Sequence, residues 1–257
     1  MAVRPVETET ASQSGLLSLE EFLAQLQATG EERYHHRHPF HLLMHEGKLS
    51  RGQLQAWALN RYYYQSIIPI KDSIILSRGP DPVFRRAWRK RVVDHDGDAT
   101  NNNDGGIKRW IKLAEATGLD PAQVRAGTGI LPATRFAVNE YINIVRSRTL
   151  LEAVASSLTE LFSTKLITLR VEKLRQHYPW LAGGLAYFEA RLYQAPEDSQ
   201  FAFNYVYDNA KTRAEQELAI QALRDKCDIL WAQLDALYFA YVEPGWPPPG
   251  AFRIEAR

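Results

Sequence analysis

Residues 50–77 read SRGQLQAWALNRYYYQSIIPIKDSIILS, and this stretch decides the fold class. Ser50 and Gln53 have the spacing of a capping box, in which each residue satisfies a backbone N–H of the other at the start of a helix. Pro69 inside the stretch predicts a kink, because proline removes one helical hydrogen bond. The sequence therefore predicts one long helix over 50–77.

Similar signals mark helices on both sides of this stretch. Ser18 with Glu21 and Thr212 with Glu215 repeat the capping-box spacing, and Asp81 precedes a proline at a first helical position. We expect further helices over about 18–29 and from 81 to the polar run that begins at 97. After that run, we expect a helix that ends near 117 and a short one that starts at 120. The remaining helices are expected over 133–157, 159–176, 183–194, 197–209 and 212–242. No alternating strand pattern and no internal repeat is found. The sequence predicts an all-α, compact helical bundle in a single domain.

Glycine, proline and polar residues mark the segments between and beyond these helices. Residues 97–106, GDATNNNDGG, predict a loop. Because this loop directly follows His95, we expect it to help order or close a site there. We expect a flexible N-terminal segment over 1–16, a helical domain over 17–243 and a proline-rich tail over 244–257.

Composition excludes several classes of function. The formal net charge of +1 provides no overall field to attract nucleic acid or an anionic membrane. No apolar run reaches membrane-spanning length, and the N-terminus lacks the apolar run of a signal peptide. Cys227 is the only cysteine, which excludes an intramolecular disulfide. We therefore expect a cytoplasmic protein with neither nucleic acid nor membrane as a partner.

Polar residues recur at helical spacing in several predicted helices. Residues three or four apart share a helix face, and this applies to Arg61 with Gln65, Arg91 with His95, and Tyr187 with Arg191. A further helix projects Glu160, Ile167 and Arg170 on one side, and Lys226 interrupts an apolar stripe. Together they could supply cations and hydrogen-bonding groups to one cavity. Solvated surface pairs remain the commoner meaning of such spacing.

Metal binding and thiol catalysis have partial signals. Histidines cluster at 35, 36, 38, 41 and 45, and Glu32 with His35 matches half of a di-iron carboxylate motif. The second Glu-x-x-His that such a site needs is missing from the sequence. Cys227 has no histidine near it in sequence, so a buried inert thiol is favoured over a nucleophile.

Several longer motifs, taken in order, carry a resemblance to a known family. They are YH at 34–35, HPFH at 38–41, NRYYYQ at 60–65, IPIKD at 68–72, DHDG at 94–97, DGG at 104–106, SSLTELF at 156–162, HYPW at 177–180, YF at 187–188, RL at 191–192 and KCDILW at 226–231. On these motifs the chain resembles the pyrroloquinoline-quinone synthase family over nearly its whole length.

The resemblance implies a heme-oxygenase-like fold, shared with thiaminase-like proteins, in a homodimer. It implies an oxidase that uses dioxygen and needs neither a metal nor an organic cofactor. The substrate would be a bicyclic quinoid precursor that bears several carboxylates. Ring closure and an eight-electron oxidation would yield pyrroloquinoline quinone (PQQ) and hydrogen peroxide.

The resemblance also assigns roles to residues. Tyr34, Arg61, Tyr64, Gln65, Lys71, Arg91, Arg170 and Lys226 would bind the substrate, together with Arg191, which would also act in catalysis. His95 would be the principal base, assisted by His35, Glu160, Tyr141 and Tyr187, and His95, Tyr187 and Arg191 would stabilise reduced oxygen. One departure is Ile167, where some members of the family have a histidine.

Three alternatives stay open at this point. A metal-dependent oxidase of the same fold would use Glu32, His35 and other histidines, and a thiaminase-like hydrolase would need Cys227 as its nucleophile. A non-catalytic protein that stores or delivers PQQ would need no base at all.

Overall fold

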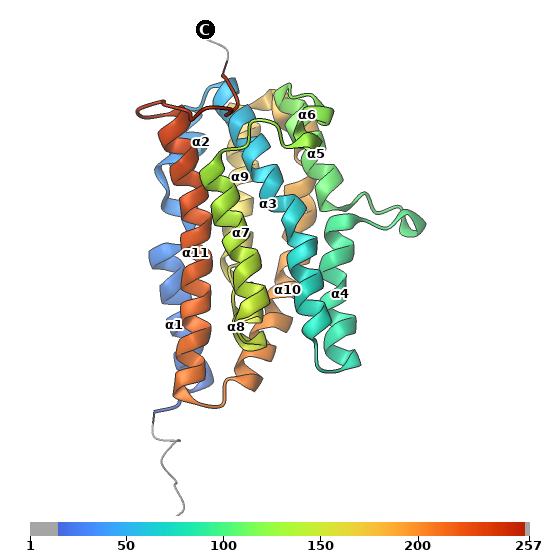
Figure 1. The fold of residues 1–257 in the computed structure, drawn as a ribbon, viewed down its shortest axis with the longest axis vertical. Helices are drawn as coiled ribbons and strands as arrows, with labels where there is room; N and C mark the ends of the chain where they lie inside the picture. Colours follow the sequence, from blue (N-terminus) through green and yellow to red (C-terminus); the bar gives the residue numbers. More distant parts are fainter. Residues whose placement is uncertain (1–14, 255–257) are drawn as a thin grey trace, which may run out of the picture.

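The computed structural model describes residues 15–254, and almost all of its regular structure is helical (Figure 1). The helices are α1 (Leu19–Arg33), α2 (Pro39–His45), α3 (Arg51–Arg78), α4 (Pro82–Asp96), α5 (Gly105–Thr117), α6 (Pro121–Ala126), α7 (Pro132–Ser147), α8 (Leu150–Ala155), α9 (Glu160–His177), α10 (Ala186–Asn209) and α11 (Arg213–Tyr241). Within the described residues the only extended pairing is an isolated bridge between Asp98 and Asn103. The predicted all-α class is confirmed.

The long helices run roughly parallel to the long axis of the molecule, with α1 beside α11 at one side and α4 at the other (Figure 1). The interior contains two apolar clusters. One gathers around Trp57, Trp110 and Phe188, and the other around Phe22, Trp88 and Val138. Members of both clusters, together with polar side chains from several helices, line one cavity. No helix among the described residues is long and apolar enough to cross a membrane.

The helix starts that the sequence marks are formed as predicted. The capping boxes at Ser18, Ser50 and Thr212 all have both of their hydrogen bonds, and the Asp81 side chain accepts from Val83 and Phe84. Helix α3 continues through Pro69 to Arg78. The local signals therefore fix the bundle's principal helix ends.

The predicted continuous helix over 133–157 is wrong. Thr149 starts a new helix, α8, with a capping box of its own: its hydroxyl accepts from Glu152 N at 3.2 Å, and Glu152 Oε2 accepts from Thr149 N at 3.1 Å. Arg148 has extended backbone angles and ends α7. The apolar periodicity continues across this break, which is why periodicity alone joined the two helices.

Two predicted breaks are instead inside helices. Helix α1 continues past Gly30 to Arg33, and a Cβ added at Gly30 would lie only 2.3 Å from Phe162 Cζ, so the glycine serves close packing. The predicted helices 183–194 and 197–209 form one helix, α10, through Pro196. Residues on both sides of this proline, including Ala195 and Asp198, are buried.

The predicted loop over 97–106 is compact. Asp98 and Asn103 exchange two backbone hydrogen bonds of 2.9 Å, and the tip extends away from the helices (Figure 1). Gly105, with φ +69°, starts α5 and lies where a Cβ would come within 2.6 Å of the His95 carbonyl oxygen. This close approach joins the end of the loop to the backbone of His95.

Residues 1–14, which include most of the predicted flexible segment, lie outside the described residues. The described part of the predicted tail packs against the helical body, where Phe252 N donates to Gly129 O and Tyr241 Oη donates to Phe252 O.

The Thr149 capping box leads to a prediction for stability. Thr149→Ala removes a helix cap and should lower the free energy of unfolding by about 1 kcal/mol. Chemical denaturation measures the change. Thr168→Ala, at an exposed position inside α9, is the matched control and should change the stability by less than about 0.5 kcal/mol. An equal loss in both variants would contradict the assignment of a cap at Thr149.

Candidate active site

A cavity is lined by residues of both apolar clusters, with walls from α3, α4, α5, α7, α9, α10 and α11. All the predicted site residues except one line it: Tyr34, His35, Arg61, Tyr64, Gln65, Lys71, Arg91, His95, Tyr141, Glu160, Arg170, Tyr187 and Arg191. Aromatic and aliphatic side chains, among them Trp110, Phe188 and Leu230, complete the walls. The structure thus brings together residues that are spread over most of the sequence.

Lys226 is the one predicted residue outside the lining. Its Nζ donates to Tyr64 Oη at 2.8 Å and lies 3.4 Å from the centroid of the Tyr141 ring. The ammonium therefore lies one layer behind two residues of the cavity wall. From this position it acts on the cavity through the Tyr64 hydroxyl and through its charge.

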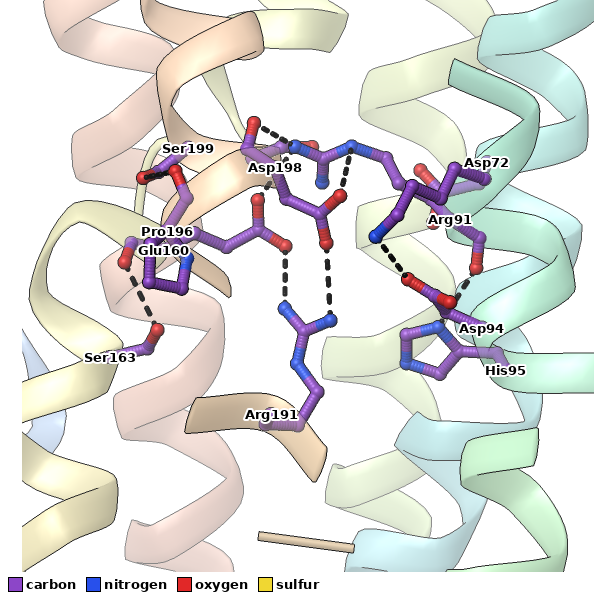
Figure 2. A network of polar contacts seen from close by, with 12 residues as sticks. Asp72, Arg91, Asp94, His95, Glu160, Ser163, Arg191, Pro196, Asp198 and Ser199 are labelled. Carbon is purple, nitrogen blue, oxygen red and sulfur yellow. Dashed lines mark hydrogen bonds and ion pairs between the residues drawn. The ribbon is translucent and has the colours of Figure 1, made fainter. Parts of the chain in front are cut away.

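Two arginines and two carboxylates among the lining residues form a closed network (Figure 2). Glu160 contacts Arg91 at 2.7 Å and Arg191 at 3.1 Å, and Asp198 contacts Arg191 at 3.1 Å. Arg91 also donates to the Asp198 carbonyl oxygen. Because each guanidinium is held from two sides, its orientation is fixed before any ligand binds.

The two carboxylates respond differently to this environment. Burial raises the pKa of Glu160, and the cations Arg91 and Arg191 only partly offset that effect. Burial also opposes ionisation of Asp198, but Arg91 and Arg191 hold its pKa below the usual range. Asp198 is therefore the fixed negative charge of the network, while Glu160 is the carboxylate closer to taking up a proton.

His95 is held in one tautomer at the cavity wall. Its Nδ1 lies 3.0 Å from the Arg91 carbonyl oxygen, which can only accept, so Nδ1 carries the proton (Figure 2). The neutral ring then has an unprotonated Nε2. Burial, with the charge of Arg191, lowers the pKa of His95 to about 4. The side chain is thus a neutral imidazole that can accept a proton.

Three cations around the cavity have no carboxylate partner. Lys71 pairs with Asp72 at 2.6 Å, and Arg91 and Arg191 share Glu160 and Asp198. In contrast, none of Arg61, Arg170 and Lys226 makes an ion pair within residues 15–254. They face aromatic rings: Arg61 lies over Tyr64, Arg170 near Trp57 and Phe188, and Lys226 over Tyr141.

Burial disfavours these unpaired charges. It lowers the pKa of Arg170 to about 10, with Arg61 contributing, and it lowers the pKa of Lys226 well below its usual value. Removing cations from water without a counter-ion costs free energy. An anionic ligand would relieve that cost, so the cavity is electrostatically suited to one that carries several negative charges.

Neutral hydroxyl groups provide the remaining polar lining. Tyr187 Oη donates to Gln65 Oε1 at 2.8 Å, and Trp110 packs edge-on against the Tyr187 ring. Burial raises the pKa of Tyr187 and raises that of Tyr34 to about 12. The phenols therefore remain protonated at neutral pH. The Tyr187 hydrogen is engaged by Gln65, so the Tyr34 hydroxyl is the one of the two that can donate to a ligand oxygen.

Sequence reasoning missed two charged residues of this site, Asp72 and Asp198. Asp72 directly follows Lys71, and adjacent residues do not share a helix face, so helical spacing did not indicate this pair. Asp198 follows Arg191 by seven residues, which is two helical turns along one face. The predicted break at Pro196 hid that relation. Ile167, the departure from the family pattern, is buried in the cavity wall.

Comparison with known proteins places this chain in a family. Residues 23–236 match the TENA/THI-4/PQQC family. A pyrroloquinoline-quinone synthase of Granulibacter bethesdensis is 55% identical over 238 residues, which cover 92% of each chain. One from Acidiphilium cryptum is 56% identical over 238 residues, or 92% of this chain and 96% of the relative.

The chain belongs to the TENA/THI-4/PQQC family. The fold agrees with this. A crystal structure from Shewanella denitrificans, titled as a domain of unknown function with a heme oxygenase-like fold, superposes with a TM-score of 0.73 at 11% identity. The superposition covers 93% of this chain and all of that one. The predicted heme-oxygenase-like fold is confirmed.

In the structure of this TENA/THI-4/PQQC family member, Glu32 and His35, which a metal-dependent oxidase would use, have different surroundings. The Glu32 side chain is 64% exposed, whereas His35 is buried. In the part of the chain that the structure describes, no group of three or more metal-binding side chains is present. The thiol alternative gains no support either, since burial raises the pKa of Cys227 to about 12 and the residue is not in the cavity lining.

His95 leads to a prediction for the pH dependence of stability. Its pKa is about 4 in the folded chain and near 6.5 when the chain unfolds. The unfolded chain therefore binds more protons between these values. This contribution to the free energy of unfolding is complete above about pH 6.5 and is lost as the pH falls toward 4.

We expect His95→Gln, which cannot take up this proton, to lose less stability than the parent between about pH 7.5 and pH 5. Chemical denaturation at both values measures the difference. His177→Gln, at an exposed position, serves as the control and should lose as much as the parent. If His95→Gln also loses as much, His95 is not buried as a neutral group.

Proposed function

We propose that this chain is a pyrroloquinoline-quinone synthase, which closes the last ring of a polycarboxylate quinoid precursor and oxidises it with dioxygen to PQQ. Relatives that bear this name are 53–56% identical over at least 90% of the chain. The observation that supports the proposal from the structure is the excess of buried positive charge. Arg61, Arg170 and Lys226 lack carboxylate partners, and the cavity beside them is lined by further polar and basic side chains that suit an anionic substrate.

The charges suggest how the substrate would be held. Carboxylates and quinone oxygens would accept hydrogen bonds from Arg61 and Arg170, and Tyr34 and Gln65 would add neutral polar contacts. Arg91 and Arg191 are already engaged by Glu160 and Asp198, so they would present a rigid positive edge. The carboxylates of the network would repel ligand carboxylates and so set which end of the substrate approaches Arg191.

Ring closure and oxidation of the precursor would require a base that removes protons from it and groups that stabilise reduced oxygen. His95 Nε2 is the basic atom in the lining whose state the backbone fixes, so we assign it the role of principal base. Each two-electron transfer from the substrate that reduces dioxygen to hydrogen peroxide also moves two protons to oxygen. Tyr187 and Arg191 lie in the same lining and would stabilise the reduced oxygen.

We propose further that no metal or organic cofactor takes part, since an electron-rich substrate ring can itself pass electrons to dioxygen. With Ile167 in the wall, proton transfer at that position would fall to other groups, and Glu160 and Tyr141 lie within the same lining. A homodimer and a cytoplasmic location remain part of the proposal.

Oxygen consumption tests this function directly. Purified, metal-depleted protein mixed with the precursor should consume dioxygen and release PQQ and hydrogen peroxide without any added cofactor. Uptake that requires added iron would contradict the metal-free proposal. Tight binding of PQQ with no oxygen uptake would identify a protein that stores or delivers PQQ, and so contradict the enzymatic function.

One substitution tests the role of the unpaired cations. Arg61→Gln keeps a polar side chain but removes a charge, so PQQ should dissociate about 10- to 100-fold more readily, because a charge-assisted hydrogen bond contributes about 1.5–3 kcal/mol. Fluorescence titration with PQQ measures the change. Arg89→Gln, exposed on α4, is the control and should bind like the parent. Unchanged binding by Arg61→Gln would contradict a direct contact.

A further inference from the structure

A second histidine, His41, lies directly behind the cavity residue His35. His35 opens the short turn His35–Arg37, and His41 follows in α2. Both side chains are buried, with 3% and 2% of their surface exposed. Their Nδ1 atoms are 3.1 Å apart. Two nitrogens at that distance must share one proton, since one has to donate and the other to accept.

The backbone decides which nitrogen donates. His41 Nδ1 also lies 2.9 Å from the His35 carbonyl oxygen, and that oxygen can only accept. His41 Nδ1 therefore carries the proton and directs it to both His35 O and His35 Nδ1. His35 Nδ1 is then an acceptor, so the neutral ring of His35 carries its proton on Nε2.

The surrounding charges keep both rings neutral. Arg170 Nη2 lies 3.0 Å from His41 Nε2 and 3.3 Å from His41 Nδ1, which places a cation against this ring. Burial and Arg170 hold the pKa of His41 well below its usual value. Burial, Arg61 and Arg170 do the same for the pKa of His35, and Lys226 and His36 act in the same direction. The groups that face the pair are thus cationic or neutral.

We propose that His41 is a positioning residue that fixes His35 as a hydrogen-bond donor to the bound ligand, through Nε2–H. This rests on the proposed function, because the ligand that would accept is the anionic quinoid. His35 then differs from His95, whose Nδ1–H donates to the Arg91 carbonyl oxygen and whose Nε2 accepts. The cavity would hold two neutral histidines with opposite tautomers, one to donate and one to remove protons.

With its proton on Nε2, His35 can act on the ligand as a hydrogen-bond donor but not as a base. A neutral ring with its proton on Nε2 cannot take a proton from the substrate at that atom. It can stabilise an oxygen on which negative charge increases, as a quinone oxygen does when the ring is reduced. Replacing His41 would change the function of His35 while leaving His35 itself in place.

Nitrogen-15 NMR of the histidine rings in the whole protein tests the proposal. In the ligand-free parent we expect the His35 signals to show a protonated Nε2 and a bare Nδ1. His41→Asn keeps an N–H at the same number of bonds from Cβ and should preserve this pattern. His41→Leu removes the donor and should give a mixture of both tautomers.

His45→Leu is the matched control, since His45 lies one turn further along α2 and makes no hydrogen bond to His35 within the described residues. It should leave the His35 signals unchanged. A His35 with Nδ1 protonated in the parent, or an unaltered pattern in His41→Leu, would overturn the proposal. If His41→Leu fails to fold, the parent and His41→Asn still decide the matter.

Addition of PQQ to the parent tests the donor role. The His35 Nε2–H signal should shift in proportion to the bound fraction, and an unshifted signal on saturation would overturn the role. Absence of PQQ binding would instead contradict the proposed function, while the tautomer measured without ligand would stand.

Discussion

The cavity depends on an imbalance of buried charge. Six basic side chains surround it, but Asp72, Glu160 and Asp198 are the only carboxylates that pair with them in the described residues. Burying unpaired cations is costly, and aromatic faces offset only part of that cost. The paired half of the set is rigid and satisfied. The unpaired half, Arg61, Arg170 and Lys226, would be stabilised by an anionic ligand, although the net charge of the whole chain is only +1.

Backbone carbonyl oxygens near these buried cations determine where the ring protons of two histidines lie. One carbonyl oxygen, that of Arg91, fixes the proton of His95, and another, that of His35, fixes the proton of His41. Both carbonyls belong to short local segments, so the tautomers follow from the fold before a ligand arrives. Such preorganisation matters for catalysis because groups already oriented need no rearrangement at the moment of reaction. The backbone of α4 therefore determines which ring nitrogen of His95 carries the proton, and the turn before α2 does the same for His41.

Much of this could be predicted from the sequence, where the deciding signals are local. Helix starts at Ser18, Ser50 and Thr212 depend on residues three positions apart, and the pairs on α3, α4 and α10 depend on one helix face. The predictions that were wrong or incomplete concern residues whose partners are distant in sequence, or positions where two local signals compete. Gly30 is a packing contact with Phe162, and Thr149 restarts a helix within a continuous apolar pattern. Asp198 reaches Arg191 only because α10 continues through Pro196, and the place of Lys226 behind Tyr64 required the packing of α11 on α3.

A crystal structure of the protein with PQQ bound tests the central claim most directly. The account predicts ligand carboxylate oxygens within about 3.2 Å of the guanidinium groups of Arg61 and Arg170, the usual range for charge-assisted hydrogen bonds. It also predicts that no ligand carboxylate lies against Glu160 or Asp198. A ligand bound outside this cavity, or one whose carboxylates face solvent while Arg61 and Arg170 keep only their aromatic contacts, would contradict it.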